Sequence, residues 1–377
     1  MSATTVAYPS QSLRSTPKSF WLRDAKWDLA FITLSVVLVP LPYLFYLLGV
    51  RFGVDADVSR NVVNGFVAVA VGGPHMMSTM LRTGLDNSFK RNYPILVRSS
   101  VIIPMVVIAL AFLNLNLLLT IFFFWASLHV LHQVSYIVEL YNHKEEHFVR
   151  PHSTVSPLAR LIDYSVIMTC LFPVASYKIS KGTFDIGSND LTASIPTFFQ
   201  QTWFFVAMTS LFTIAISAFA MKSYYEYRGG YINWPKTIFI MLTVMVAASV
   251  PALPNLDTAF QGMNTWHSFQ YLAITFYIIK LRQKYGSLDN DAPLVARFSK
   301  GENSRGLFAL STMMLVGSAA VFALVYGFIA IFLPNMESNK HFDTAYYTSV
   351  LSFLWIHYYH DHFLFTNFEA LDIAYEK

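Results

Sequence analysis

The chain has 377 residues, of which 55% are hydrophobic and only 13% charged, against roughly a quarter charged in an ordinary soluble domain. This composition excludes a protein whose apolar surface is buried in one soluble core. The single cysteine, Cys170, excludes an intramolecular disulfide and a metal site built from several cysteines. The net charge of +4 does not indicate nucleic-acid binding, because membrane topology accounts for the basic residues, and we expect no nucleic-acid partner.

Apolar runs near 20 residues long predict an all-α, polytopic integral membrane bundle of about ten transmembrane spans. The first 20 residues are polar and lack an apolar signal core, so we expect a cytoplasmic tail there and not a cleaved leader. The predicted spans are residues 28–50, 61–81, 98–114, 117–141, 160–177, 198–221, 236–252, 259–281, 307–333 and 344–366.

The distribution of lysine and arginine tests this span count, because these residues collect in the cytoplasmic connections. With the N-terminus inside, 21 of the 26 basic residues fall on the cytoplasmic side and five fall outside. The alternation predicts both termini in the cytoplasm, with an N-terminal tail over residues 1–26, one transmembrane domain over 27–367 and a C-terminal tail over 368–377. We expect the chain to lie in a cytoplasmic (inner) membrane.

Seven of the 11 histidines lie inside predicted spans. Ionisable groups are costly at membrane depth, so they usually mark a functional site. The four spans that carry them all run from outside to inside and place the histidines at similar depths, with His267 nearer the outer end. The seven are His75, His129, His132, His267, His357, His360 and His362.

Helical geometry at about 100° per residue sorts these side chains by face. A polar stripe within about 80° on the fourth span joins His129, His132, Tyr136, Glu139 and His143. On the last span His357, His360 and Asp361 share a face and His362 points the other way. We therefore expect the site to exclude His362, His147, His152 and His341.

The second and eighth spans add further polar groups. In the second, Gly72-Gly73-Pro74 precedes His75 and predicts an interrupted helix that lines a cavity; the alternative is a simple kink in a packed span. Ser78, Thr79 and Arg82 follow on the face of His75. On the eighth, His267 and Tyr271 share one face with Asn264 and Gln270.

A metal site explains this clustering better than separate core histidines do. Imidazoles at one depth repel one another if protonated and gain little if neutral, unless a metal uses their lone pairs. Glu139 and Asp361 are candidates for a ligand or for the acceptor that orients a ligand. The candidate ligands are His75, His129, His132, His267, His357, His360 and Asp361.

This layout resembles the membrane non-haem iron oxygenases, through His129-Val130-Leu131-His132 and His357-Tyr358-Tyr359-His360. Two types are similar. In the Brp/Blh type of carotene dioxygenase, single histidines from separate spans hold one iron. In the fatty-acid desaturase and hydroxylase type, histidine boxes hold two irons, but this chain lacks their adjacent His-His pairs.

The sequence and the resemblance together predict a membrane-embedded, metal-dependent oxidative enzyme, an oxygenase, hydroxylase or desaturase. It would use mononuclear or dinuclear non-haem iron, or another transition metal, on a lipid-soluble substrate such as a fatty acyl chain or an isoprenoid. Tyr136, Tyr271 and Glu139 are the candidate catalytic residues, the tyrosines as proton or electron relays. The expected partners are that substrate, membrane lipids and an electron-donor protein on the cytoplasmic side. The alternatives are a metal or proton transporter and a haem-binding redox protein, although two histidines three apart on one helix project to the same side of a haem.

Overall fold

The structure is a computed structural model that describes residues 19–149, 154–186, 189–301, 303–336 and 338–366. Residues 1–18 of the predicted N-terminal tail, the predicted C-terminal tail and His152 lie outside the described residues. Within them the fold is helical, apart from a short antiparallel pair of strands, β1 (Asp185–Ile186) and β2 (Asn189–Asp190), between two helices.

The longer helices are α2 (Pro40–Arg51), α3 (Ala56–Val67), α4 (Gly73–Arg82), α7 (Ile102–Leu113), α8 (Leu115–Lys144), α9 (Pro157–Thr169), α10 (Phe172–Ser180), α11 (Thr202–Arg228), α12 (Trp234–Ser249), α13 (Leu256–Lys284), α16 (Arg305–Met313), α17 (Leu315–Phe332) and α18 (Ser338–Thr366). The short α-helices are α1 (Ala25–Asp28), α5 (Asn87–Asn92), α6 (Pro94–Ser99), α14 (Leu288–Asp291) and α15 (Pro293–Ser299). Three π-helical turns are η1 (Leu29–Thr33), η3 (Ala68–Gly72) and η4 (Glu145–Val149). Four 3-10 turns are η2 (Leu34–Leu38), η5 (Thr192–Ser194), η6 (Thr197–Gln200) and η7 (Val250–Ala252).

Seven helical segments of the described chain are long and apolar enough to cross a membrane, which supports a helical membrane protein. Each coincides with one of the ten predicted spans. They are Ala25–Arg51, Pro94–Leu113, Leu115–His147, Pro157–Ser180, Thr202–Arg228, Trp234–Ala252 and Arg305–Phe332. The total of ten spans and the side of the membrane that each terminus faces remain predictions.

The other three predicted spans are also helical and of similar length, but they are less apolar. They correspond to α3, η3 and α4 run together, to α13 of 29 residues, and to α18 of 29 residues. These segments carry His75, His267 and His357. The polar residues that make them candidates for a site are the same residues that lower their hydropathy.

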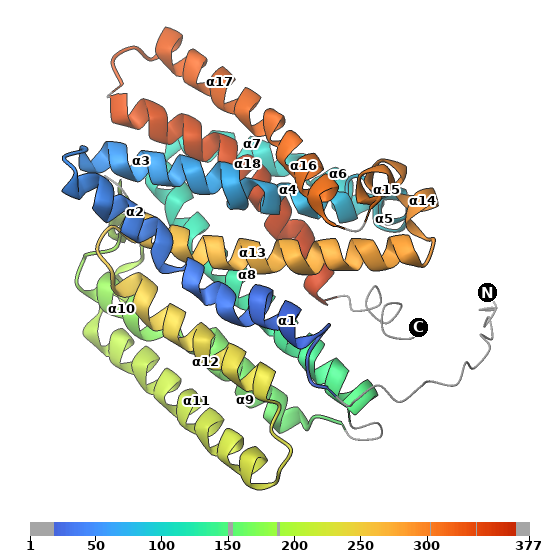
Figure 1. Cartoon of the computed structure of the whole chain (residues 1–377). Coiled ribbons are helices and arrows are strands. Elements are labelled where there is room, and N and C mark those ends of the chain that lie inside the picture. The colour runs from blue at the N-terminus through green and yellow to red at the C-terminus, as the bar shows by residue number, and fades with distance from the viewer. Residues whose placement is uncertain (1–18, 150–153, 187–188, 302, 337, 367–377) are drawn as a thin grey trace.

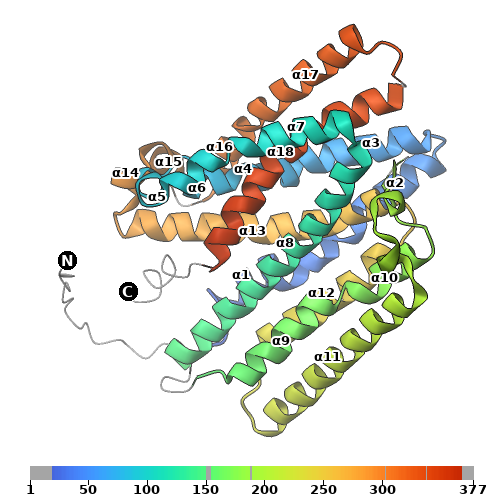
Figure 2. The ribbon, with the colours of Figure 1, turned by 180° about the vertical axis from the view of Figure 1, so that it is seen from behind.

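The polar helices lie inside the bundle and the apolar helices surround them. α13 runs through the middle of the molecule in Figure 1 and packs against α2, α4 and α8. α18 packs against α4, α7, α8 and α17, while α9 to α12 form a group along the lower side. Seen from behind, α8 passes between this lower group and α18 (Figure 2). Four helices, α4, α8, α13 and α18, therefore converge at the centre.

The second predicted span is not broken at Gly72-Gly73-Pro74. The helix instead widens into the π-helical turn η3 directly before α4, and Pro74 occupies the first turn of α4. A proline lacks the N–H that a helix interior needs, and single π-helical turns are frequent at functional sites. Gly73 is required for packing, because a Cβ there would lie 2.4 Å from the Ala68 carbonyl oxygen and 2.6 Å from a Leu315 methyl carbon.

Candidate metal centre

Four histidines meet at the centre of the bundle, one from each of the four converging helices. They are His75 on α4, His129 on α8, His267 on α13 and His357 on α18. One ring nitrogen from each lies within 4.8 Å of one from every other. The ring centroids of neighbouring pairs lie between 4.3 Å, for His75 and His357, and 4.9 Å, for His129 and His267.

The four rings are almost sealed from solvent, with exposed fractions of 0 to 4%. Each ring nevertheless has a buried nitrogen with no hydrogen-bond partner among the described residues: Nε2 of His75, His129 and His357, and both nitrogens of His267. Most buried polar atoms in proteins are hydrogen-bonded, because an unpaired one costs about 1 to 3 kcal/mol. Four buried rings that meet in this way, each with an unpaired nitrogen, form a donor set that suits a metal ion.

The opposite nitrogens of two rings are held by hydroxyl groups. Nδ1 of His75 lies 2.9 Å from the Ser268 hydroxyl oxygen, and Nδ1 of His357 lies 2.5 Å from the Thr79 hydroxyl oxygen. When Nδ1 carries the proton it donates to these oxygens, and the lone pair of Nε2 is free. This arrangement fixes the orientation of the ring, as the outer contacts of metal-binding histidines commonly do.

Asp361 and Tyr271 lie beside the four histidines. The Tyr271 hydroxyl donates to Asp361 Oδ1 over 2.7 Å, and the Thr79 hydroxyl donates to the same oxygen over 2.9 Å. Asp361 Oδ2 lies 3.4 Å from His357 Nδ1 and 3.9 Å from His129 Nε2. Asp361 Oδ2, which has no hydrogen-bond partner among the described residues, therefore faces two of the four histidine rings, although Asp361 is not part of the group of four ligand atoms.

The structure does not bring His132 or His360 to this point. The half-buried His132 ring lies 5.1 Å from the ring of the exposed His362 and 5.3 Å from Phe365. Both nitrogens of His360 are hydrogen-bonded, to Ser100 over 2.7 Å and to Thr83 over 3.0 Å. A residue three positions after a ligand is rotated by about 60° and shifted by about 4.5 Å along the helix. The sequence prediction grouped such pairs on one helical face, and this grouping included residues that do not reach the shared point. His147 and His341 also lie outside the group of four.

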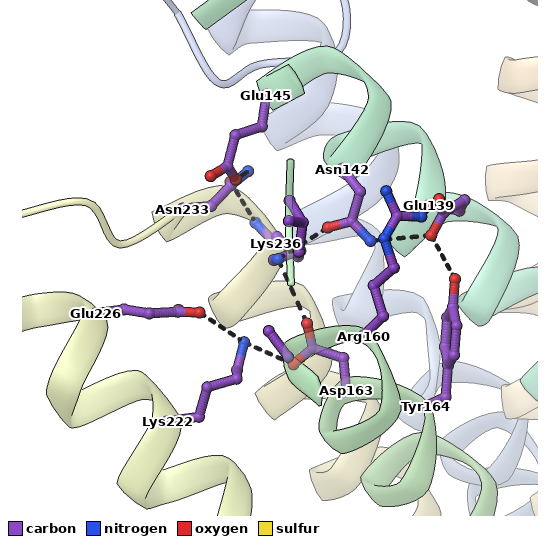
Figure 3. Close-up of polar contacts among 12 residues, drawn as sticks. Glu139, Asn142, Glu145, Arg160, Asp163, Tyr164, Lys222, Glu226, Asn233 and Lys236 are labelled. Atoms are coloured by element: carbon purple, nitrogen blue, oxygen red, sulfur yellow. Dashed lines mark hydrogen bonds and ion pairs between the residues drawn. The ribbon is translucent and has the colours of Figure 1, made fainter. Parts of the chain in front are cut away.

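The structure places Glu139 in a second buried polar network near the C-terminal end of α8 (Figure 3), where His143 Nε2 lies 3.8 Å from its carboxylate. Its carboxylate pairs with Arg160, accepts a hydrogen bond from the Tyr164 hydroxyl, and accepts another from the Asn142 amide over 2.9 Å. Glu139 follows His129 by ten residues, which is about 15 Å along α8. In the same network Asp163 pairs with Lys222 over 2.8 Å, and these contacts join α8, α9 and α11.

Tyr136 lies on the face of His129 but about 10 Å farther along the helix. Its ring stacks on Phe365 at 4.9 Å, and its hydroxyl is hydrogen-bonded to Arg82. Tyr271 is the candidate catalytic residue that packs directly against the group of four, with its ring 4.7 Å from that of His75.

Sequence reasoning placed Thr79 on the face of His75 but did not predict its contact with His357, and it missed Ser268 and Tyr358. Tyr358 stacks on His129 with centroids 4.2 Å apart. Thr79 follows His75 by four residues on the same helical face, and Ser268 directly follows His267. The sequence signal for these two residues is a hydroxyl side chain one or four positions after a histidine. The same spacing also occurs at many positions that form no site.

A cavity of about 90 Å³ adjoins this group of residues between η3, α8, α13 and α18. Its wall includes Tyr358 and also Asn264, whose side-chain oxygen accepts a hydrogen bond of 3.3 Å from Ser268. Most of the remaining lining is apolar or aromatic, including Phe122, Phe123 and Leu354. The cavity therefore reaches Tyr358, which stacks on His129, and Asn264, which is one hydrogen bond away from the Ser268 hydroxyl beside His75.

No protein-family model, no curated protein and no solved structure matches this chain.

Proposed function

We propose that this chain is a membrane-embedded, metal-dependent oxidative enzyme that acts on a lipid-soluble substrate. One non-haem ion, for which we favour iron, would be held by His75, His129, His267 and His357. The observation that carries the proposal is that the four rings each bring one nitrogen within 4.8 Å of the others, and that each ring has a buried nitrogen without a hydrogen-bond partner among the described residues.

The distances between the four nitrogens and the neutral charge of the imidazole rings both suit a transition metal ion. Metal to imidazole nitrogen distances near 2.0 to 2.1 Å keep two ligands of one ion at most about 4.2 Å apart. The four nitrogens lie within 4.8 Å of one another, so the widest pair needs to close by less than about 1 Å. Neutral imidazoles suit iron, copper, zinc and nickel. Four nitrogens fill the usual tetrahedral set of zinc, whereas an iron ion that accepts five or six ligands keeps open positions.

One ion per chain is favoured over two. Each of the four helices contributes one histidine, while His132 and His360 are engaged elsewhere. Single histidines from separate helices are the arrangement of the carotene dioxygenase type that the sequence resembles. The histidine boxes of the desaturase and hydroxylase type have no counterpart in this group.

The bound iron would supply an open position for dioxygen and a change of oxidation state. The chain's own residues would keep the site dry and the ligands oriented. Burial of the four rings excludes water, and Thr79 and Ser268 hold the protonated nitrogens of His357 and His75. The Tyr271 hydroxyl, hydrogen-bonded to Asp361, is the group placed to give up or accept a proton at this site.

The substrate would enter from the membrane, where apolar molecules and dioxygen both partition. The apolar lining of the adjoining cavity supports this class of substrate. Desaturation and hydroxylation also consume external electrons, so for these reactions an electron-donor protein on the cytoplasmic side would be a partner.

Metal analysis of the purified protein, together with its absorption spectrum, tests the proposal. We expect about one iron per chain and no haem absorption band. Replacing His267 by alanine should remove the iron, whereas His132→Ala, the matched control, should retain it. A purified chain that binds no transition metal after reconstitution, or that loses metal equally in both variants, contradicts the proposal.

A further inference from the structure

A groove of about 800 Å³ runs along the side of α13 that faces away from the histidines. Its residues on this helix include a stripe at intervals of three or four positions, half-buried or exposed on a helix whose other faces are mostly buried. The stripe is Phe269, Ala273, Tyr277, Lys280 and Lys284. At about 100° per residue, His267 and Tyr271 lie about 160° around the helix from Phe269. The groove is therefore separate from the metal centre.

The first predicted span lines the same groove with a second stripe. Arg23, Trp27 and Phe31 follow one another at intervals of four residues. The Trp27 ring lies 5.5 Å from that of Tyr277, and the Phe31 ring lies 5.3 Å from that of Phe269. The Arg23 guanidinium lies 5.4 Å from the centre of the Tyr277 ring. The two stripes thus run in register, with aromatic side chains along the groove and basic side chains at one end.

The positive charge at this end is not balanced by the protein. Arg23, Lys280 and Lys284 line the groove, and none of its described lining residues is acidic. Asp24 pairs with Arg23 over 3.4 Å, but these side chains are 49 and 53% exposed, and such solvated pairs are weak. Lys280 donates to two backbone carbonyl groups. Neither lysine has a carboxylate partner among the described residues. The basic end therefore suits an anionic ligand.

The length of the groove matches one leaflet of a bilayer. From Phe269 to Lys284 the helix advances by 15 residues, which is about 22 Å. A bilayer with its headgroups is about 40 to 45 Å thick, so one leaflet is about 20 to 22 Å. When α13 crosses the membrane, the aromatic end lies near the midplane and the basic end lies at headgroup depth. This is the side that the distribution of lysine and arginine predicts to be cytoplasmic.

The volume of the groove suits one acyl chain and a headgroup. At roughly 30 Å³ for each group of about the size of a water molecule in the liquid, a chain of 18 carbon atoms needs about 540 Å³. The groove of about 800 Å³ has room for this chain and for a phosphate group, and it lies within the usual range of ligand pockets, about 300 to 1,000 Å³.

We infer that this groove binds an anionic phospholipid of the membrane. The phosphate lies among Arg23, Lys280 and Lys284, and one acyl chain follows the aromatic stripes toward the midplane. A phosphodiester presents oxygens on more sides than a carboxylate does, which suits cations on two separate segments. The surplus of positive charge selects against a zwitterionic headgroup, whose ammonium group is repelled. Because the groove and the histidines occupy opposite faces of α13, the inference stands whether or not the chain binds iron.

Lipids with identical acyl chains test the inference. The purified full chain in detergent is titrated with dioleoylphosphatidylglycerol, dioleoylphosphatidylcholine or oleate, and native mass spectrometry counts the molecules bound. We expect one phosphatidylglycerol per chain, bound at least about fivefold more tightly than phosphatidylcholine, which is the usual contribution of one basic residue near an anionic lipid. Equal binding of the two phospholipids, or tighter binding of oleate, overturns the inference.

A charge variant assigns the preference to the basic end. Arg23→Gln combined with Lys284→Gln should weaken phosphatidylglycerol binding by about 25-fold, since each side chain contributes about fivefold. The matched control combines Arg228→Gln with Lys90→Gln, which removes the same two charges at exposed positions outside the groove. The control should bind within about twofold of the unaltered chain. An equal loss in both double variants would assign the binding to general surface charge and reject the groove.

A bulky side chain tests the apolar part of the groove without a change of charge. Ala273→Trp places an indole where the acyl chain would lie and should weaken phosphatidylglycerol binding by about tenfold or more. Ala320→Trp, at an exposed position on α17, is the matched control and should bind normally. Full affinity in a folded Ala273→Trp variant would place the lipid elsewhere and overturn the inference. The charge variants, which lie at exposed positions, decide the question even if this tryptophan prevents folding.

Discussion

The Thr79 hydroxyl oxygen lies 2.5 Å from Nδ1 of His357, across two helices that are far apart in the sequence. It also donates to Asp361 over 2.9 Å. One hydroxyl therefore connects a candidate ligand to the carboxylate behind it, and this contact fixes which nitrogen of His357 faces the other histidines.

Replacing Thr79 by valine should weaken metal binding by about 10 to 100-fold, the usual cost of losing a group that orients a ligand. Valine has nearly the same shape, so the packing of α4 against α18 should persist. Thr79→Ser keeps the hydroxyl and should restore binding to within a few-fold. Competition titration with a chelator measures both, and equal affinity of the valine variant and the unaltered chain would show that the contact has no such role.

His360→Ala should separate stability from metal binding. Both ring nitrogens of His360 are hydrogen-bonded within the described structure, so the variant removes two hydrogen bonds and should lower the free energy of unfolding by about 1 to 3 kcal/mol. The iron content should not change. The melting temperature and metal content are measured on one preparation, with His357→Ala as the variant that loses metal. Loss of iron from His360→Ala at a temperature where it remains folded would place His360 in the site.

Glu139→Gln should also lower the stability of the protein without changing its iron content, but for a different reason. Glu139 is joined to Arg160, Tyr164 and Asn142 in the network of Figure 3 and lies about 15 Å along α8 from His129. The amide leaves Arg160 with a weakened partner, so thermal stability should fall while metal content stays constant. A drop in iron that exceeds the fraction of unfolded protein would instead connect this network to the metal centre.

The positions of the helices could be read from the sequence because a span is a local property. The boundary at Asn114 is an example, since its side chain caps α8 by accepting a hydrogen bond of 3.0 Å from the Leu117 amide. The length of the apolar runs predicted all ten helical segments, with ends that differ from the observed ones by at most about seven residues. They include the three segments that are too polar to qualify as spans by hydropathy.

The members of the site could be predicted only in part. Helical phase placed His129, His357 and Asp361 inward, but it could not separate them from His132 and His360, which differ by about 60° of rotation. That separation depends on how α8 and α18 are rotated against α4 and α13, which is decided by packing across the bundle. The contacts of Thr79 with His357 and of Ser268 with His75 could not be predicted for the same reason, because each joins two different helices.

The final prediction concerns Tyr271, the candidate catalytic residue that packs directly against the group of four histidines. Tyr271→Phe removes the hydroxyl that donates to Asp361 and leaves the ring against His75. Because the hydroxyl touches no candidate ligand nitrogen, iron content should remain near that of the unaltered chain. If the hydroxyl transfers a proton during the reaction, turnover should fall by about 100-fold or more, as losses of positioned proton donors usually do. Tyr136→Phe is the matched control: its hydroxyl is bonded to Arg82 and it should retain most of the turnover. Single-turnover rates with a lipid-soluble substrate, measured beside metal content, compare the two variants. A Tyr271→Phe variant with full iron and full rate would exclude the hydroxyl from proton transfer and leave Tyr271 as a packing residue of the site.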